Sequence, residues 1–414
     1  PDYPMLSPAK ATHRAALAVV VLTFILNLMS RMGETFAVFL LPIEAEFEWN
    51  RATLSTVYGL YMGAHGVSGI LIGALVDRVG PRLVYTLGLL LYSTAFFLAQ
   101  FANAPWHLFL TTGVLAGIAM TSIGMTTATV LLTGWYRGDL ERWRPIAISV
   151  TYSGLGAGVI LWVPIAHILI ENFGWRTAYL WLSISTLCLA AIVYLLPWNR
   201  FCSPLLARTR STQTSPPLKR LGILTVTAQP TFWPLFAVLF LTAIAIFSIA
   251  PQLVAYLVAM GFGKGTATIA YSVNGMMALF GITATGWLVS RFGSRRAATV
   301  TYMMTILGLV ALSLLIYSPQ LVLLSIAILV GGLSQGSRGP IVSTLVSRLY
   351  PATTLGLVHG AVTMGIGLGG MIGAALSGLL VDLTGGYGGS FTVAIIAAGL
   401  ACSLFWSVKE LRNG

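Results

Sequence analysis

The residues best suited to chemistry in this sequence are charged side chains inside apolar stretches. Asn27, Arg31 and Glu34 lie in AALAVVVLTFILNLMSRMGETFAVFLLP at spacings of four and three, which puts them on one face of a helix. Arg338 lies near the middle of LVLLSIAILVGGLSQGSRGPIVSTLVSRLY, a stretch without an acidic residue. Guanidinium groups bind carboxylates and phosphates through paired hydrogen bonds, and a buried carboxylate can take up and release a proton. The chemistry that these residues predict is anion binding with proton exchange.

The composition indicates that these charges lie in a membrane. The chain has 414 residues, of which 57% are hydrophobic and 8% are charged, whereas soluble chains are about 25% charged. The net charge of +12 does not indicate nucleic-acid binding, because the basic residues lie in short loops between apolar runs. Cys188, Cys202 and Cys402 have no metal-binding or redox spacing.

The chain contains twelve apolar runs long enough to cross a membrane, since a spanning helix needs about 20 residues. We predict spans at 15–42, 53–76, 83–103, 107–133, 145–170, 176–197, 231–259, 266–289, 297–317, 320–349, 355–381 and 390–408. The segment WNRFCSPLLARTRSTQTSPPLKRLG divides them into two sets of six. We therefore predict an all-α integral membrane fold with an N-terminal six-helix bundle (1–197), a cytoplasmic linker (198–230) and a C-terminal six-helix bundle (231–414).

The distribution of basic residues predicts the orientation. With the N-terminus inside, 18 of the 23 Lys and Arg residues fall on the cytoplasmic side, and the opposite loops carry only Arg51, Arg176 and Lys264. Cytoplasmic loops of membrane proteins carry this excess of positive charge. We expect both termini to be cytoplasmic, in a multi-pass protein of the inner (plasma) membrane.

The two halves contain an internal repeat that resembles a known family. Residues 73–82 read GALVDRVGPR and residues 286–295 read GWLVSRFGSR, each after the second helix of its half. The first copy resembles the loop motif of the major facilitator superfamily, Gly-x-Leu-x-Asp-Arg-x-Gly. The resemblance implies a cytoplasmic latch that helps to hold the outward-facing state, and the acid is replaced by a serine in the second copy. The alternative is that the motif carboxylate is a solvated loop charge. The gating residues that the motif implies are Gly73, Asp77, Arg78, Gly80 and Arg82.

A second resemblance is to the bacterial monocarboxylate transporters and their oxalate:formate antiporter relatives. It rests on EAEFEWNRATLSTVYGLYM, on the glycine-spaced SGLGAG with Pro164, and on SGLLVDLTGGYGGSF. Those families carry an Arg in helix eight, and the oxalate branch a Lys in helix eleven, that hold the substrate carboxylate. This sequence has Asn274 and His359 in those helices instead. The substrate is therefore not implied by the resemblance.

In the superfamily, helices one, four, seven and ten line a central cavity, so the resemblance places Arg31 and Arg338 on the same cavity. We predict that they form a clamp for an anionic substrate. In the alternative arrangement, Arg31 pairs with Glu34 and Arg338 bonds helix-end carbonyls. Pro251 is expected to kink helix seven. The predicted substrate-binding set is Arg31, Arg338, Asn27, Gln335, Asn274 and Tyr256.

Three residues are candidates for proton coupling. Glu34 is the carboxylate placed well inside a predicted helix, and His65 and His359 follow it because histidine titrates near neutral pH. Two alternatives remain open: the histidines are packed, hydrogen-bonded residues, or an acidic substrate brings its own proton.

The sequence lacks the Walker loop, HExxH and CxxC motifs and a paired-carboxylate site. We therefore expect no enzyme, no cofactor and no metal. The function predicted is a secondary transporter, a symporter of a small monocarboxylate-like organic anion and protons, that works by alternating access. We expect a monomer that contacts substrate, proton and lipid and binds no nucleic acid. The alternatives are an exporter of drugs or less polar metabolites and a transporter-like nutrient sensor.

Overall fold

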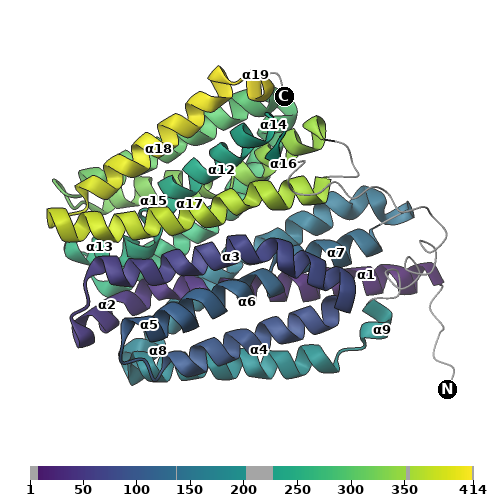
Figure 1. Cartoon of the computed structure of the whole chain (residues 1–414), viewed down its shortest axis with the longest axis horizontal. Helices are drawn as coiled ribbons and strands as arrows, with labels where there is room; N and C mark the ends of the chain where they lie inside the picture. Colours follow the sequence, from purple (N-terminus) through teal and green to yellow (C-terminus); the bar gives the residue numbers. More distant parts are fainter. Residues whose placement is uncertain (1–7, 137, 202–226, 351–354, 413–414) are drawn as a thin grey trace.

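The computed structural model describes residues 8–136, 138–201, 227–350 and 355–412, and these residues contain helices and no strand. Most helices run along the long axis of the molecule, and both chain termini lie at the same end (Figure 1). We call this end the terminal end and the opposite end the distal end. The earlier half of the chain forms one layer of helices and the later half the other.

The first half contains six passes, which we number as spans 1 to 6. Span 1 is α1 (Pro8–Ser30), the 3₁₀ turn η1 (Arg31–Thr35) and α2 (Phe36–Phe47); span 2 is α3 (Arg51–Val79); span 3 is α4 (Pro81–Ala99). Span 4 is α5 (Pro105–Leu108), the π-helical η2 (Phe109–Leu115), α6 (Ala116–Ile123) and α7 (Met125–Trp135). After η3 (Gly138–Trp143), α8 (Arg144–Leu195) supplies spans 5 and 6, and the short α9 (Trp198–Phe201) follows.

The second half repeats this order. Span 7 is α12 (Phe232–Phe247), η5 (Ala250–Gln252) and α13 (Leu253–Ala259), and α14 (Lys264–Leu314) supplies spans 8 and 9. Span 10 is α15 (Leu321–Gln335) and α16 (Arg338–Leu349), span 11 is α17 (Leu355–Thr384), and span 12 is α18 (Gly388–Ser407), followed by α19 (Lys409–Arg412). The two halves together give the twelve predicted passes.

Glycines with positive φ form the turns inside the long helices. Gly174 divides α8 with φ 79° and ψ 161°, and Gly293 divides α14 with φ 81° and ψ 164°. Gly80, between α3 and α4, has nearly the same angles, 80° and 164°. Only glycine adopts this region without strain. Gly80 and Gly293 occupy the same place in the two copies of the sequence repeat, so the repeat is also present in the backbone.

Four spans are interrupted part-way through the bundle. Span 1 changes to a 3₁₀ turn at Arg31, and span 4 is broken at Gly124. Span 7 is broken at the turn that contains Pro251, as the sequence predicts. Span 10 is broken between Gln335 and Arg338. Interrupted helices expose backbone groups, and transporters place substrate sites at such breaks.

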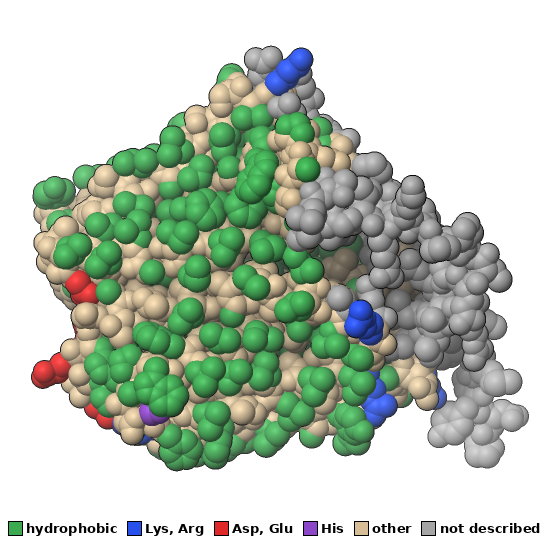
Figure 2. All heavy atoms as spheres, in the orientation of Figure 1, with side chains coloured by type: hydrophobic (Ala, Val, Ile, Leu, Met, Phe, Trp, Pro, Cys, Tyr) green, Lys and Arg blue, Asp and Glu red, His purple; other side chains and the backbone are tan. Residues whose placement is uncertain are grey.

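The surface matches a membrane environment. Apolar side chains cover the face shown in Figure 2, while Lys and Arg lie towards the terminal end and acidic residues lie at the distal end. Among the described residues, nine helical segments are long and apolar enough to cross a membrane, where α8 counts as one, and α15 is a shorter apolar helix. The all-α membrane fold is therefore confirmed. Most of the predicted linker, residues 202–226, lies outside the described residues, and the domain boundaries stay a prediction.

Candidate functional site

A central cavity of about 360 Å³ lies between the two halves. Its walls come from spans 1 and 5 of the first half and from spans 7 to 11 of the second half. Spans 1, 7 and 10 line the cavity as expected. Among the described lining residues, none belongs to span 4 and several belong to span 8. The volume falls in the range of small-molecule sites, about 300 to 1,000 Å³.

Glu34 lines the cavity, is only 5% exposed and is the centre of a polar cluster. Its Oε1 pairs with Arg31 Nη1 at 2.9 Å. Its Oε2 accepts hydrogen bonds from the hydroxyls of Tyr58 (2.6 Å) and Tyr271 (3.1 Å). Tyr58 belongs to span 2 and Tyr271 to span 8, so this carboxylate joins the two halves. Three donors compensate the desolvation of the buried charge.

Glycines of span 5 allow it to pack closely against the segment of span 1 that carries Arg31. A methyl group at Gly158 would overlap the Leu28 carbonyl and lie 2.8 Å from Arg31 Cβ, and one at Gly156 would lie 2.6 Å from Leu279 Cγ. The SGLGAG motif thus allows span 5 to approach span 1 with one glycine and span 8 with the next. Close helix approach is what such spacing permits.

Arg338 also lines the cavity, in a different environment. It is the first residue of α16, it is 3% exposed, and its guanidinium bonds the carbonyls of Ser334 and Thr301 and the hydroxyl of Thr305. Its Cζ lies 4.6 Å from the centroid of the Tyr302 ring. Ser334 is at the C-terminal end of α15, where free carbonyls favour a cation. The break in span 10 therefore creates acceptors for this buried arginine.

These contacts correspond to the alternative arrangement of the two arginines. Arg31 pairs with Glu34, and Arg338 bonds carbonyls near a helix end. Both arginines nevertheless line the same cavity, and the remaining charged residue in its lining is Glu34. With Glu34 ionised, the described lining has a net charge of +1.

The other predicted substrate residues divide into two groups. Gln335 and Asn274 line the cavity, and Asn274 Nδ2 lies 3.5 Å from the Ile328 carbonyl. Asn27 is fully buried and donates to the Thr23 carbonyl at 2.9 Å. Tyr256 donates to the Leu312 carbonyl at 2.5 Å and packs on other aromatic rings. The latter two residues are outside the cavity lining.

Of the two candidate histidines, His65 is outside the described cavity lining. His65 Nδ1 is 2.9 Å from Thr121 Oγ1, in a contact between spans 2 and 4. The His359 side chain lies outside the described residues.

The loop motif is described only in part. Gly80 makes the turn, Arg78 is exposed, and Arg82 donates to the Tyr194 carbonyl at 3.1 Å while stacking on that ring. Arg82 therefore connects the start of span 3 to the end of span 6. Gly73 lies one turn before the motif acid in α3. The Asp77 side chain lies outside the described residues, so the latch that it would form stays a prediction.

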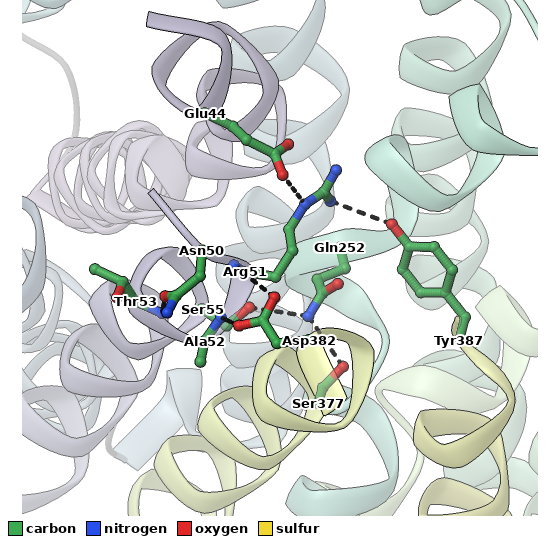
Figure 3. Close-up of polar contacts among 10 residues, drawn as sticks. All are labelled: Glu44, Asn50, Arg51, Ala52, Thr53, Ser55, Gln252, Ser377, Asp382 and Tyr387. Atoms are coloured by element: carbon green, nitrogen blue, oxygen red, sulfur yellow. Dashed lines mark hydrogen bonds and ion pairs between the residues drawn. The ribbon is translucent and has the colours of Figure 1, made fainter. Parts of the chain in front are cut away.

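A second polar cluster joins the halves at the distal end (Figure 3). Asp382, at the end of span 11, accepts hydrogen bonds from the backbone N–H groups of Arg51 (3.0 Å) and Ala52 (2.7 Å) at the start of α3. Arg51 also donates to Glu44 (2.5 Å) and to the Tyr387 hydroxyl (3.2 Å). A carboxylate at a helix N-terminus is favourable. Together with the neighbouring Gln252–Ser55 hydrogen bond (2.9 Å), these contacts hold the halves together at this end.

Tyr271, Tyr302 and Asp382 were not among the predicted site residues. Tyr271 lies three residues before Asn274, so the two share a helical face, and this spacing could have identified it. Asp382 is one of only 11 acidic residues, and that scarcity was its signal. Nothing in the sequence marks Tyr302, because its role depends on the partner helix.

Comparisons with known proteins agree with this arrangement. The Major Facilitator Superfamily matches residues 23–320 and 301–413. Monocarboxylate transporter 13 of Rattus norvegicus is 28% identical over 360 residues, which cover 87% of this chain and 81% of that protein. Monocarboxylate transporter 11 of Homo sapiens is 29% identical over 332 residues, 78% of this chain and 67% of that protein.

A bacterial relative matches over a greater length. The uncharacterized MFS-type transporter YcxA of Bacillus subtilis (strain 168) is 25% identical over 409 residues, 95% of each chain. The predicted resemblance to the superfamily and its monocarboxylate transporters is confirmed. With its twelve helical passes, repeated halves and family match over nearly the whole sequence, this chain belongs to the major facilitator superfamily of membrane transporters.

Proposed function

We propose that this transporter carries a small monocarboxylate together with a proton by alternating access. The observation that supports this most directly is the charge of the central cavity, whose described lining contains two arginines, Arg31 and Arg338, and one carboxylate, Glu34. One monoanion neutralises the remaining positive charge. The similarity to proteins named monocarboxylate transporters points to the same substrate class.

Glu34 is proposed as the proton carrier because its partners are sensitive to its charge. Its ionised form is held by Arg31, Tyr58 and Tyr271. Protonation would weaken the ion pair with Arg31 and free that guanidinium for the substrate carboxylate. Arg31 has the exposure for this exchange, since 23% of its side chain is accessible. Proton and anion would then bind together.

Arg338 is proposed to attract the anionic substrate through its positive charge before it bonds the substrate directly. Its terminal nitrogens are bonded to carbonyl and hydroxyl groups, and no carboxylate is among these partners. A desolvated charge attracts an anion more strongly than an exposed one does. The clamp with Arg31 would form when a substrate carboxylate competes with these neutral acceptors.

The side of access follows from the charge pattern. With the predicted orientation, the distal end faces outside. We propose that the Asp382 cluster closes the cavity on that side and that this is a conformation open towards the cytoplasm. The motif residues Gly73, Asp77, Arg78, Gly80 and Arg82 would form the opposing latch in the outward-facing state, as in the family motif.

The first experiment is a thermal-shift screen of the purified protein with carboxylates, neutral metabolites and cationic drugs. Wild type and Arg338→Ala are compared. Stabilisation of wild type alone by a carboxylate supports the proposal and gives the ligand class. Stabilisation of both proteins by neutral or cationic compounds contradicts it.

The proton step is tested with Glu34→Gln in proteoliposomes. We expect this variant to exchange labelled carboxylate across the membrane but not to accumulate it when a pH gradient is imposed. Accumulation equal to that of wild type would remove Glu34 from the mechanism and leave a substrate that brings its own proton.

A second candidate function is the export of less polar compounds. It is favoured by the apolar residues that form much of the cavity wall in spans 7, 8 and 9. The same thermal-shift screen separates the two functions, because an exporter of neutral compounds would bind them without Arg338.

A further inference from the structure

The lining of the cavity combines a few charged groups with many apolar side chains. Arg31 and Glu34 come from span 1, and Arg338 comes from the break in span 10. The apolar side chains, which we call the apolar wall, include Val159, Leu279, Ile246, Phe247 and Ile366, from spans 5, 8, 7 and 11. A substrate that reaches Arg31 with its carboxylate must lay the rest of its body against this wall.

Two of the polar side chains in the lining, Thr242 and Thr305, already have partners. Thr242 bonds the Val238 carbonyl (2.6 Å) and the Tyr302 hydroxyl (2.5 Å). Thr305 bonds Ser334 Oγ (2.9 Å) and the Thr301 carbonyl (3.0 Å). A substrate hydroxyl beside Thr242 or Thr305 would lose its water and find both side-chain hydroxyls already bonded, which is unfavourable. A second carboxylate that packs against the apolar side chains would lose its hydration, which costs more.

We propose that the substrate is a monocarboxylate with an apolar body of about four or more carbons, straight, branched or aromatic. This proposal rests on the proposed function and restricts its substrate class. The carboxylate binds at Arg31, on the side of the guanidinium that Glu34 leaves free, and the hydrocarbon body packs on Leu279, Val159 and Ile246. Small hydroxy acids and dicarboxylates bind weakly, because they use the charge and not the wall.

The test is a binding series of straight-chain carboxylates, from acetate to hexanoate, with lactate and succinate for comparison. Dissociation constants are measured by titration calorimetry on the full chain in nanodiscs, and empty nanodiscs correct for partition into lipid. Each added methylene should lower Kd about fourfold, which gives roughly 200-fold from acetate to hexanoate. Lactate should bind no more tightly than propionate.

Two neighbouring residues of span 8 supply the variant and its matched control. Leu279 lines the cavity, whereas the adjacent Phe280 is 59% exposed and is outside the lining. Leu279→Ser should reduce the gain per methylene to about twofold or less. Phe280→Ser should keep the full gain. If Leu279→Ser does not fold, Ile246→Ser is used, with the same expected result.

Each outcome has one meaning. Binding that tightens with chain length in wild type and Phe280→Ser, but not in Leu279→Ser, supports the proposal. Equal binding along the series, tighter binding of lactate, or a full chain-length gain in the Leu279 variant overturns it while leaving carboxylate transport intact. Absence of binding by every carboxylate overturns the proposed function itself.

Discussion

The two arginines of the central cavity have the same side chain and opposite surroundings. Arg31 has a carboxylate partner, Glu34, at 2.9 Å and keeps 23% of its side chain accessible. Arg338 is 3% exposed and is surrounded by carbonyls, a hydroxyl and an aromatic ring. The charge of Arg31 is compensated by the protein, and the charge of Arg338 is only solvated by it. The first arginine is suited to exchange partners, and the second to supply a constant positive field.

The backbone explains the difference. Arg31 begins a 3₁₀ turn, so Glu34 lies three residues on, at hydrogen-bonding distance on the same face. Arg338 begins a new helix directly after another has ended, and the carbonyls at that end are free to accept from it. The buried charge of Arg338 is thus stabilised by carbonyls at a helix break, whereas the charge of Arg31 is stabilised by an acid of the same span.

Of the changes that test this comparison of the two arginines, removal of Arg31 should have the largest effect, and the effect is on stability. Arg31→Ala leaves Glu34 buried without a cation, which costs about 3 to 5 kcal/mol when one member of a buried pair is lost. We expect a clearly lower midpoint of thermal unfolding in detergent.

The double variant Arg31→Ala/Glu34→Gln separates stability from binding. It should recover most of the lost midpoint, because no buried charge remains unpaired, but it should not recover carboxylate binding. A single Arg31→Ala variant that unfolds like wild type would show that Glu34 does not depend on this partner.

Removal of Arg338 should affect binding more than stability. Its acceptors keep other bonds, for example Thr305 with Ser334 and Thr301. We expect Arg338→Ala to fold and to lose about 2 to 3 kcal/mol of carboxylate binding, about 30- to 150-fold in Kd.

Arg338→Lys keeps the charge and is the matched control. It should recover part of the lost affinity, although it cannot reproduce the fork of donors. Normal uptake by Arg338→Ala would show that the arginine is structural and would leave Arg31 as the sole anion site.

Much of the fold could be predicted from the sequence because it depends on length and composition. Runs of about 20 apolar residues predict spans wherever the backbone must satisfy its own hydrogen bonds in lipid. Gly80 and Gly293 lie in a repeated motif, so the two turns were also predictable. The breaks in spans 1 and 4 were not, because no proline marks them as Pro251 marks span 7. The break in span 10 lies just before Pro340, a signal that was not used in the prediction.

The site was predictable as a set of residues but not as a set of contacts. Arg31, Glu34 and Arg338 stand out because charges are rare in apolar runs. Which of two arrangements they adopt depends on groups from distant helices, such as the Tyr271 hydroxyl and the Thr301 carbonyl, that no local pattern connects to them. Asn27 and Tyr256 have the right residue types for a site but bond to backbone carbonyls away from the cavity.

A pair of hydroxyl deletions gives the finest test of the comparison. Tyr271→Phe removes a donor to the charged Glu34, and Tyr302→Phe removes a hydroxyl contact with the neutral Thr242 while keeping the ring beside Arg338. Bonds to charged groups contribute about 1.5 kcal/mol or more, and neutral ones about 1 kcal/mol or less.

Tyr271→Phe should shift the pH dependence of proteoliposome uptake, because it changes the environment of the proton carrier and a contact between the halves. Tyr302→Phe should lower the unfolding midpoint slightly and leave the pH profile unchanged. Equal pH profiles for both variants would mean that Glu34 does not titrate during transport, and the division of roles between the two arginines would then have no basis in proton coupling.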